Sequence, residues 1–167
     1  MKTLLAAIGL SCLASVAVAA ETTPASFTTD AATAGMAEVT LSRLAVQKST
    51  NPTIKKFAEM MLKDHSEAVA KLKAVAEADK IAVPTAPTPE QQAVAKELAE
   101  KSGPAFDAAY AAQMVKDHEK AVALFSAASD DADMTQNLRI FAARTLPTLE
   151  HHLDEAKKLT DALAQHH

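Results

Sequence analysis

The stretch MLKDHSEAVAKL, residues 61–72, recurs further along the chain as MVKDHEKAVALF, residues 114–125. In each copy a histidine follows a methionine by four residues, so the two side chains lie one turn apart on the same face of a helix. Apolar residues continue at spacings of three and four, which is the pattern of a helix with one buried face. The repeat therefore predicts two amphipathic helices with a histidine on each buried face.

The predicted buried faces contain further polar residues. Three of the expected helices each leave one gap in the heptad pattern of apolar residues, and a histidine fills it: His65, His118 and His152. The first expected helix has no histidine, but Glu38 falls at the inner face of its apolar stripe or at the border of that face. Counting along the helices puts Glu38, His65 and His118 at similar heights. The count leaves the height of His152 open, because Pro147 is expected to kink its helix.

Chain breaks divide the sequence into helices. Thr28 to Asp30 offer an N-cap, and Asn51-Pro52 is a helix start with proline at the first helical position. Prolines make residues 80–88 a linker, and Thr88 opens a capping box. The expected elements are helices from about 28 to 47, 52 to 79, 89 to 101 (short), 104 to 128 and 134 to 164.

This arrangement predicts an all-α fold in one domain, residues 28–164. Four long helices with short connections form a four-helix bundle, and the long connection carries a short extra helix. That long connection, between the second and third long helices, suits a ferritin-like topology better than an up-down-up-down one, and both remain open. Residues 21–27 are expected to form a flexible leader, and residues 165–167 a tail.

The N-terminus has the pattern of a secretory signal peptide. Met1 and Lys2 precede an apolar segment from Leu4 to Ala20, and the small residues of Ala17-Val18-Ala19 form a cleavage pattern. Cleavage after Ala19 or Ala20 is expected, and a retained membrane anchor is the competing interpretation. The sequence thus predicts export by a Sec-type route and no transmembrane span after cleavage.

Composition excludes several classes of site. The single cysteine of the chain lies at position 12, so a chain cleaved as expected has neither disulfides nor thiolate metal ligands. Loss of Lys2 leaves 16 basic and 21 acidic residues, a net charge of −5. An acidic chain argues against a nucleic-acid partner, which would require a basic face.

The histidines and Glu38 form a candidate metal site. Neutral imidazoles and a carboxylate suit transition metals such as Fe, Zn or Cu. Asp64 and Asp117 are candidate further ligands, or groups that orient a histidine on a neighbouring helix. The competing interpretation is that the core histidines only form hydrogen bonds across the bundle.

The methionines allow a narrower hypothesis. Met61 and Met114 each stand one turn before a histidine, and thioether with imidazole suits Cu(I). Methionine also fills irregular core space, and that interpretation is favoured here. Catalysis has less support, because a di-iron bundle requires Glu-x-x-His and none of the three core histidines has a glutamate three residues before it. No catalytic residue is predicted, and the sequence favours a protein that is not an enzyme.

Four segments resemble one bacterial family, catalogued as domain of unknown function 4142. The resemblance rests on Gly35-Met36-Ala37-Glu38-Val39, Phe57-Ala58 with Asp64-His65, Met114-Val115 with Asp117-His118, and Thr145-Leu146-Pro147 with His152-Leu153. It implies a ferritin-like helical bundle exported to the periplasm or the outer-membrane fraction, and it brings no established activity.

The function expected from these observations is an exported bundle protein that holds a transition metal in a core His/Glu cluster. The alternative is a metal-free envelope protein for stress protection or interaction, with structural or pH-responsive histidines. An envelope protein partner and a homo-oligomer both remain open.

Overall fold

A computed structural model describes residues 22–165 of the chain, and every regular element in that part is helical. The helices are α1 (Pro24–Lys48), α2 (Pro52–Ala78), α3 (Pro89–Glu100), α4 (Gly103–Asp130) and α5 (Gln136–Ala164). The predicted all-α fold, with four long helices and one short extra helix in the long connection, is confirmed. The predicted signal peptide, residues 1–20, and the last two tail residues lie outside the described residues.

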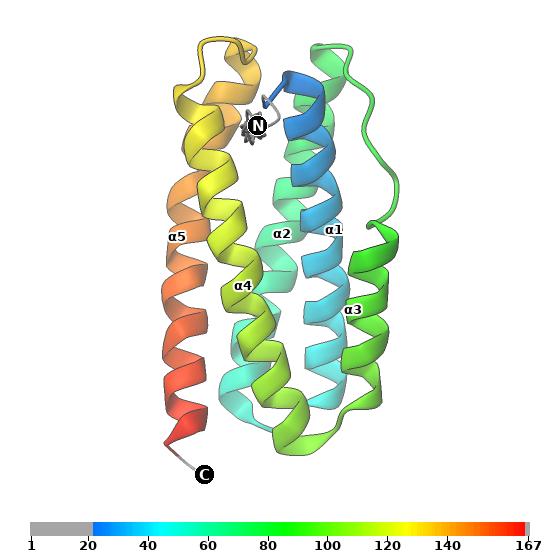
Figure 1. Cartoon of the computed structure of the whole chain (residues 1–167), viewed down its shortest axis with the longest axis vertical. Helices are drawn as coiled ribbons and strands as arrows, with labels where there is room; N and C mark the ends of the chain where they lie inside the picture. Colours follow the sequence, from blue (N-terminus) through cyan, green and yellow to red (C-terminus); the bar gives the residue numbers. More distant parts are fainter. Residues whose placement is uncertain (1–21, 166–167) are drawn as a thin grey trace, which may run out of the picture.

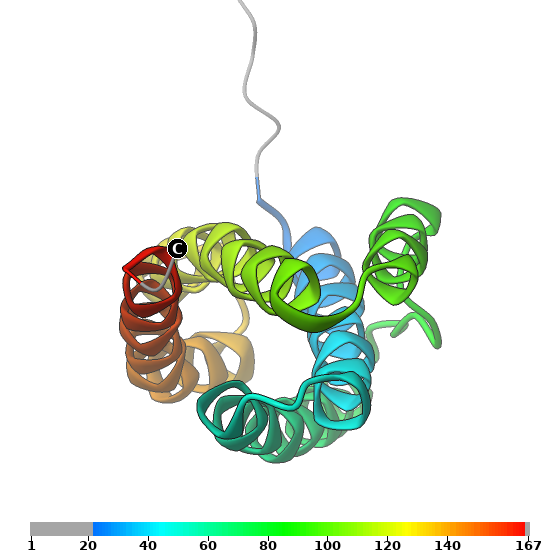
Figure 2. The same cartoon turned by 90° about the horizontal axis from the view of Figure 1, so that it is seen from below.

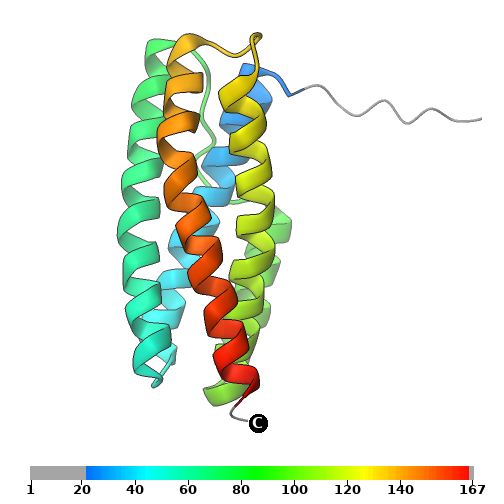
Figure 3. The ribbon, with the colours of Figure 1, turned by 90° about the vertical axis from the view of Figure 1, so that its left-hand side faces the viewer.

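The long helices form two antiparallel hairpins, α1–α2 and α4–α5 (Figure 1). Seen end-on, α1, α2, α5 and α4 follow one another around a ring, and α3 packs outside it against α1 and α4 (Figure 2). The segment between α2 and α4 runs back along the bundle, so these two diagonal helices point the same way. A single long crossover is the connectivity of ferritin-like bundles. The side view shows α2 and α5 next to each other (Figure 3).

The first helix begins earlier than predicted. Thr23 is its N-cap: the Thr23 hydroxyl accepts from the Ser26 amide at 3.1 Å, and the Ser26 hydroxyl accepts from the Thr23 amide at 2.8 Å. This reciprocal capping satisfies two amides that a helix start would leave free. The predicted flexible leader is therefore wrong for residues 24–27, which are helical.

Packing holds the early start of α1 in place. Phe27 is fully buried, and its ring meets that of Phe125 of α4 edge-on with centroids 5.2 Å apart. Thr28, the expected cap, is buried instead, and its hydroxyl donates to the carbonyl of Pro24 at 2.7 Å. The prediction failed because Thr23 and Thr28 are both good caps, and tertiary contact of Phe27 selects the earlier one.

Asp79 connects the end of α2 to the start of α5. The Thr135 hydroxyl and the Asn137 amide both donate to its carboxylate, the latter at 2.6 Å. The Thr135 hydroxyl also accepts from the Leu138 amide and caps α5.

Helix α5 then continues through Pro147. Among the described residues no helix is long and apolar enough to cross a membrane.

The core consists of two apolar clusters. The lower one includes Met61, Phe106, Tyr110 and Met114, and the upper one includes Phe27, Leu72, Phe125, Phe141 and Leu149. On each of the four long helices, one buried ionisable residue lies between residues of the two clusters. These residues are Glu38, His65, His118 and His152. They form a polar layer across the middle of the bundle, in place of apolar packing.

Candidate metal centre

Three histidines from three helices meet in this polar layer. Their ring centroids are 5.4 Å apart for His65 and His118, 5.3 Å for His65 and His152, and 5.5 Å for His118 and His152. One ring nitrogen of each histidine lies within 4.8 Å of those of the other two. The structure therefore brings together the three histidines that the heptad gaps select, and His152 lies level with the other two.

The hydrogen bonds of His118 determine its tautomer. Its Nδ1 lies 2.9 Å from the carbonyl of Met114, which can only accept, so Nδ1 carries the proton. In the neutral ring Nε2 is then an acceptor. The Nε2 of His65 lies 3.3 Å from it and donates. The Nε2 lone pair of His118 thus points to the interior of the triad, which is the orientation of a metal ligand.

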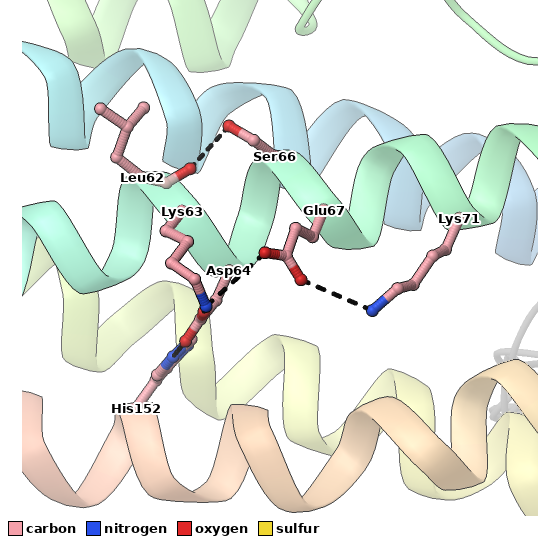
Figure 4. A network of polar contacts seen from close by, with 7 residues as sticks. All are labelled: Leu62, Lys63, Asp64, Ser66, Glu67, Lys71 and His152. Carbon is pink, nitrogen blue, oxygen red and sulfur yellow. Dashed lines mark hydrogen bonds and ion pairs between the residues drawn. The ribbon is translucent and has the colours of Figure 1, made fainter.

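His152 has a carboxylate partner on its other side. Its Nε2 donates to Oδ2 of Asp64 at 3.2 Å, and Figure 4 shows this contact between α5 and α2. Lys63 also contacts Asp64, and Glu67 with Lys71 continues the ion pairs along α2. With Nε2 protonated, Nδ1 of His152 is an acceptor, and it is buried with no partner among the described residues. A carboxylate on one nitrogen and a free lone pair on the other are features of metal-binding histidines.

Burial keeps all three rings neutral. His65, His118 and His152 are 6%, 1% and 1% exposed. Burial lowers the pKa of His118 to about 4, and it lowers the pKa of His65 well below its usual range, with neighbouring His118 and His152 adding to that effect. Burial also lowers the pKa of His152, against the opposing effect of Asp64. Neutral imidazole is the form that binds metals. None of the three rings therefore has to change from the charged to the neutral form before it binds a metal near pH 7.

Glu38 lies in the same layer but has a different partner. It is 4% exposed, and burial raises the pKa of its carboxyl well above the usual range. The neighbouring carboxyl of Asp117 raises it further. Gln113 donates to Asp117 at 2.7 Å. The group of ring nitrogens within 4.8 Å of one another contains the three histidines and does not include Glu38.

The other four candidate residues, two aspartates and two methionines, have different places in the fold. Asp64 orients His152 from the neighbouring helix, and Asp117 pairs with Glu38. Met61 and Met114 are fully buried in the lower apolar cluster, and Met114 contributes its carbonyl to His118.

Gln113 was not anticipated from the sequence. Its spacing of four residues before Asp117 is the signal that could have identified it, since such pairs lie on one face of a helix.

One pair of nitrogens in the triad has the spacing of two ligands in a coordination sphere. Two ligand atoms of a tetrahedral site with metal–nitrogen bonds of about 2.0–2.1 Å are roughly 3.3–3.4 Å apart. The Nε2 atoms of His65 and His118 are already 3.3 Å apart. Binding would require the proton of His65 to leave Nε2 for Nδ1, and this change would also free the Nε2 lone pair of His118. Nδ1 of His152 already has a free lone pair. The donor set therefore fits a transition metal ion.

Comparison with known proteins identifies one family. The sequence model of one family matches residues 12–159, nearly the whole chain. The chain belongs to the family described as Domain of unknown function (DUF4142). The resemblance seen in the four sequence segments is thus confirmed. The family's description names no activity, so any function has to be argued from the site. Searches of curated proteins and of solved structures found no match.

Proposed function

We propose that this protein is an exported helical-bundle protein that binds one transition metal ion through His65, His118 and His152. The observation that carries the proposal is the meeting of three buried neutral imidazoles from three helices, with ring nitrogens within 4.8 Å of one another. Imidazole ligands suit Zn, Cu and Fe, and affinity for divalent ions in such a set is highest for Cu²⁺. Asp64 supports His152 from outside the triad.

The competing explanation is that the histidines only replace apolar packing with hydrogen bonds. The hydrogen bond between His65 and His118 is consistent with this explanation. It leaves Nδ1 of His152 buried without a partner, however, and an unpaired buried acceptor is costly. A metal ion would satisfy that nitrogen.

Direct metal titration tests the proposal. Every protein used would carry His166→Ala and His167→Ala, so that terminal imidazoles add no binding. Zn²⁺ and Cu²⁺ are titrated by calorimetry, and Co²⁺ is followed by visible absorption, which reports on the coordination geometry. We expect one ion per chain, and binding weaker by more than about tenfold in His65→Gln, His118→Gln and His152→Gln.

The matched control is His151→Gln, because His151 is exposed and adjacent to His152 on α5. It should bind metal like the parent protein. Equal affinity in the three triad variants and in the parent would exclude the proposed site.

Export is supported by the N-terminal sequence. The expected cleavage after Ala19 or Ala20 leaves Thr23 in the chain, so the capping box of α1 would be retained. N-terminal sequencing of the protein recovered from the periplasm tests this, with Ala20 or Glu21 expected as the first residue. An intact Met1 on the recovered protein would contradict cleavage.

A further inference from the structure

A cavity lies inside the bundle beside the polar layer. Its volume is about 520 Å³, and residues of all five helices line it. The exposed lining residues include Asp30 of α1, Glu90 of α3, and Lys116 and Lys120 of α4. The cavity therefore opens between α1 and α4, near the start of α3. Its volume falls within the range of small-molecule pockets, roughly 300–1,000 Å³.

The cavity is lined by both apolar and polar side chains. Leu72, Phe125, Phe141 and Leu149 provide much of the apolar wall. Glu38, Asp117, His65 and His118 also line the cavity, and the last two belong to the triad. An apolar body with a few converging polar groups is the usual composition of a site for an organic ligand.

The two carboxyl groups in this cavity have few hydrogen-bond donors around them. Oε2 of Glu38 is buried and has no hydrogen-bond partner among the described residues. The adjacent Asp117 receives one hydrogen bond, from Gln113. His65 and His118 are neutral here and bring no positive charge to the pair. Burial and the neighbouring Asp117 raise the pKa of Glu38, so this carboxyl keeps its proton near pH 7 in the empty cavity. The pair still has one amide donor, from Gln113, and no donor for Oε2 of Glu38. A cation beside the two carboxyl groups would favour loss of the proton from Glu38.

We propose that this cavity binds a small organic amine, with its apolar body along the cavity wall and its ammonium group on Glu38 and Asp117. A primary ammonium offers three donors and a full positive charge, which is what the carboxyl pair lacks. An anion would be repelled by the same pair. The site requires no metal in the triad, so the inference stands apart from the proposed metal function.

The lysines of the cavity do not reverse this preference. Lys116 and Lys120 are exposed, and water and salt screen charges at such positions. Glu38 is buried and Asp117 is half-buried, so water and salt screen their interactions less. These two carboxyl groups therefore determine the preferred charge of the head group.

Three probes with one apolar body test the charge preference. Hexylamine, hexanol and hexanoate are titrated into the metal-free protein in the presence of a chelator at pH 7, and binding is followed by calorimetry and by NMR shifts. We expect hexylamine to bind at least about tenfold more tightly than hexanol, and hexanoate to bind most weakly. Equal or tighter binding of hexanoate would overturn the proposal, and so would the lack of saturable binding of hexylamine.

Two conservative variants test the residues. Glu38→Gln and Asp117→Asn keep the shape of each side chain and remove the acid. We expect each to weaken hexylamine binding by about tenfold or more and to leave hexanol binding unchanged, which also shows that the cavity is intact. The control Glu90→Gln changes an exposed carboxylate at the mouth and should leave both affinities within about twofold.

Unchanged amine affinity in both Glu38→Gln and Asp117→Asn would overturn the assignment. The metal-free conditions keep the result separate from the metal proposal, and hexylamine binding is repeated in His151→Gln, which changes an exposed ring outside the cavity lining. We expect that variant to bind the amine as the parent does. Amine binding that required added Zn²⁺ would count against a carboxyl site.

Discussion

At the scale of single residues, Asp64 and His118 make contacts in the candidate metal centre that their positions in the sequence do not predict. The carboxylate of Asp64 lies on the outer nitrogen of His152, 88 positions away, and not on the adjacent His65. Burial raises the pKa of this carboxyl, but the hydrogen bonds from His152 and Lys63 outweigh burial and lower it. Asp64 thus remains ionised and can stabilise a metal-bound His152.

Replacement of Asp64 should weaken metal binding without removing a ligand. We expect Asp64→Asn to reduce Zn²⁺ affinity by about 10- to 100-fold, because a neutral amide holds the ring of His152 less well and adds less electron density to it. Competition with a chromophoric chelator measures the change. Glu67→Gln, an exposed carboxylate on the same helix, should bind Zn²⁺ as the parent does, and an equal loss in both variants would assign the effect to general surface charge.

The low pKa of His118 makes stability depend on pH. Above pH 6.5 the ring is neutral in both the folded and the unfolded chain. Between pH 6.5 and about 4 only the unfolded chain binds a proton at this ring, so the free energy of unfolding falls as the pH falls. The full effect is on the order of 3 kcal/mol. Glu38 acts in the opposite sense, because its pKa is raised in the folded chain.

Comparison of variants isolates the contribution of His118. Urea unfolding of the metal-free protein at pH 7 and pH 5 should show a smaller loss of stability in His118→Gln than in the parent. His151→Gln, which changes an exposed ring, should lose as much stability as the parent. An identical loss in His118→Gln would mean that this ring titrates normally.

At the scale of helices, α1 and α2 approach closely at one glycine. A Cβ placed on Gly35 would lie 2.6 Å from Cγ2 of Val69 on α2. Alanine favours a helix by roughly 1 kcal/mol over glycine, but a contact this short forces the helices apart. The glycine therefore maintains the spacing of the first hairpin.

We expect Gly35→Ala to lower the free energy of unfolding by about 1–3 kcal/mol, since overpacking outweighs the gain in helix propensity. Val69→Ala removes the opposing methyl group, so the double variant should recover much of that loss. Urea unfolding of the four proteins of this cycle gives the coupling energy. Additive effects in the double variant would contradict a steric origin.

The start of α1 gives a second test at this scale. Thr23→Ala removes the cap hydroxyl and should cost about 1 kcal/mol of stability. Thr28→Ala removes a hydroxyl that only donates to the carbonyl of Pro24, so its cost should be smaller. Circular dichroism during urea unfolding measures both. A larger loss in Thr28→Ala would restore Thr28 as the cap of this helix.

At the scale of the whole molecule, the polar layer connects the two hairpins. His65 belongs to the first hairpin, and His118 and His152 belong to the second. A metal ion on the three rings would therefore add a link between the two hairpins to the apolar and hydrogen-bonded contacts that already join them. Such an ion stabilises only the folded chain, since the three histidines come together only there.

Zinc should raise the thermal midpoint of the protein. At a free concentration of one hundred times the dissociation constant the gain is about 2.7 kcal/mol, which corresponds to roughly 5–11 °C for a chain of this size. Differential scanning calorimetry measures the shift. His65→Gln should show little of it, and a similar shift in that variant would place the bound zinc elsewhere.

The sequence alone determined the helices and the polar layer. Heptad gaps identify His65, His118 and His152 because helical periodicity is local and fixes which side chains face inward. The chain order and the connection lengths limited the fold to a four-helix bundle and favoured a ferritin-like topology, with an up-down-up-down topology left open. The family resemblance came from the same segments.

Tertiary structure decided which polar residues meet. Glu38 faces inward as predicted, yet its neighbour is Asp117, while Asp64 reaches His152 on another helix. Sequence spacing fixes the direction of a side chain to within a face of its helix. The relative height and rotation of two helices depend on packing of the whole core, such as Phe27 on Phe125. For the same reason the cavity beside the layer is visible only in the folded chain.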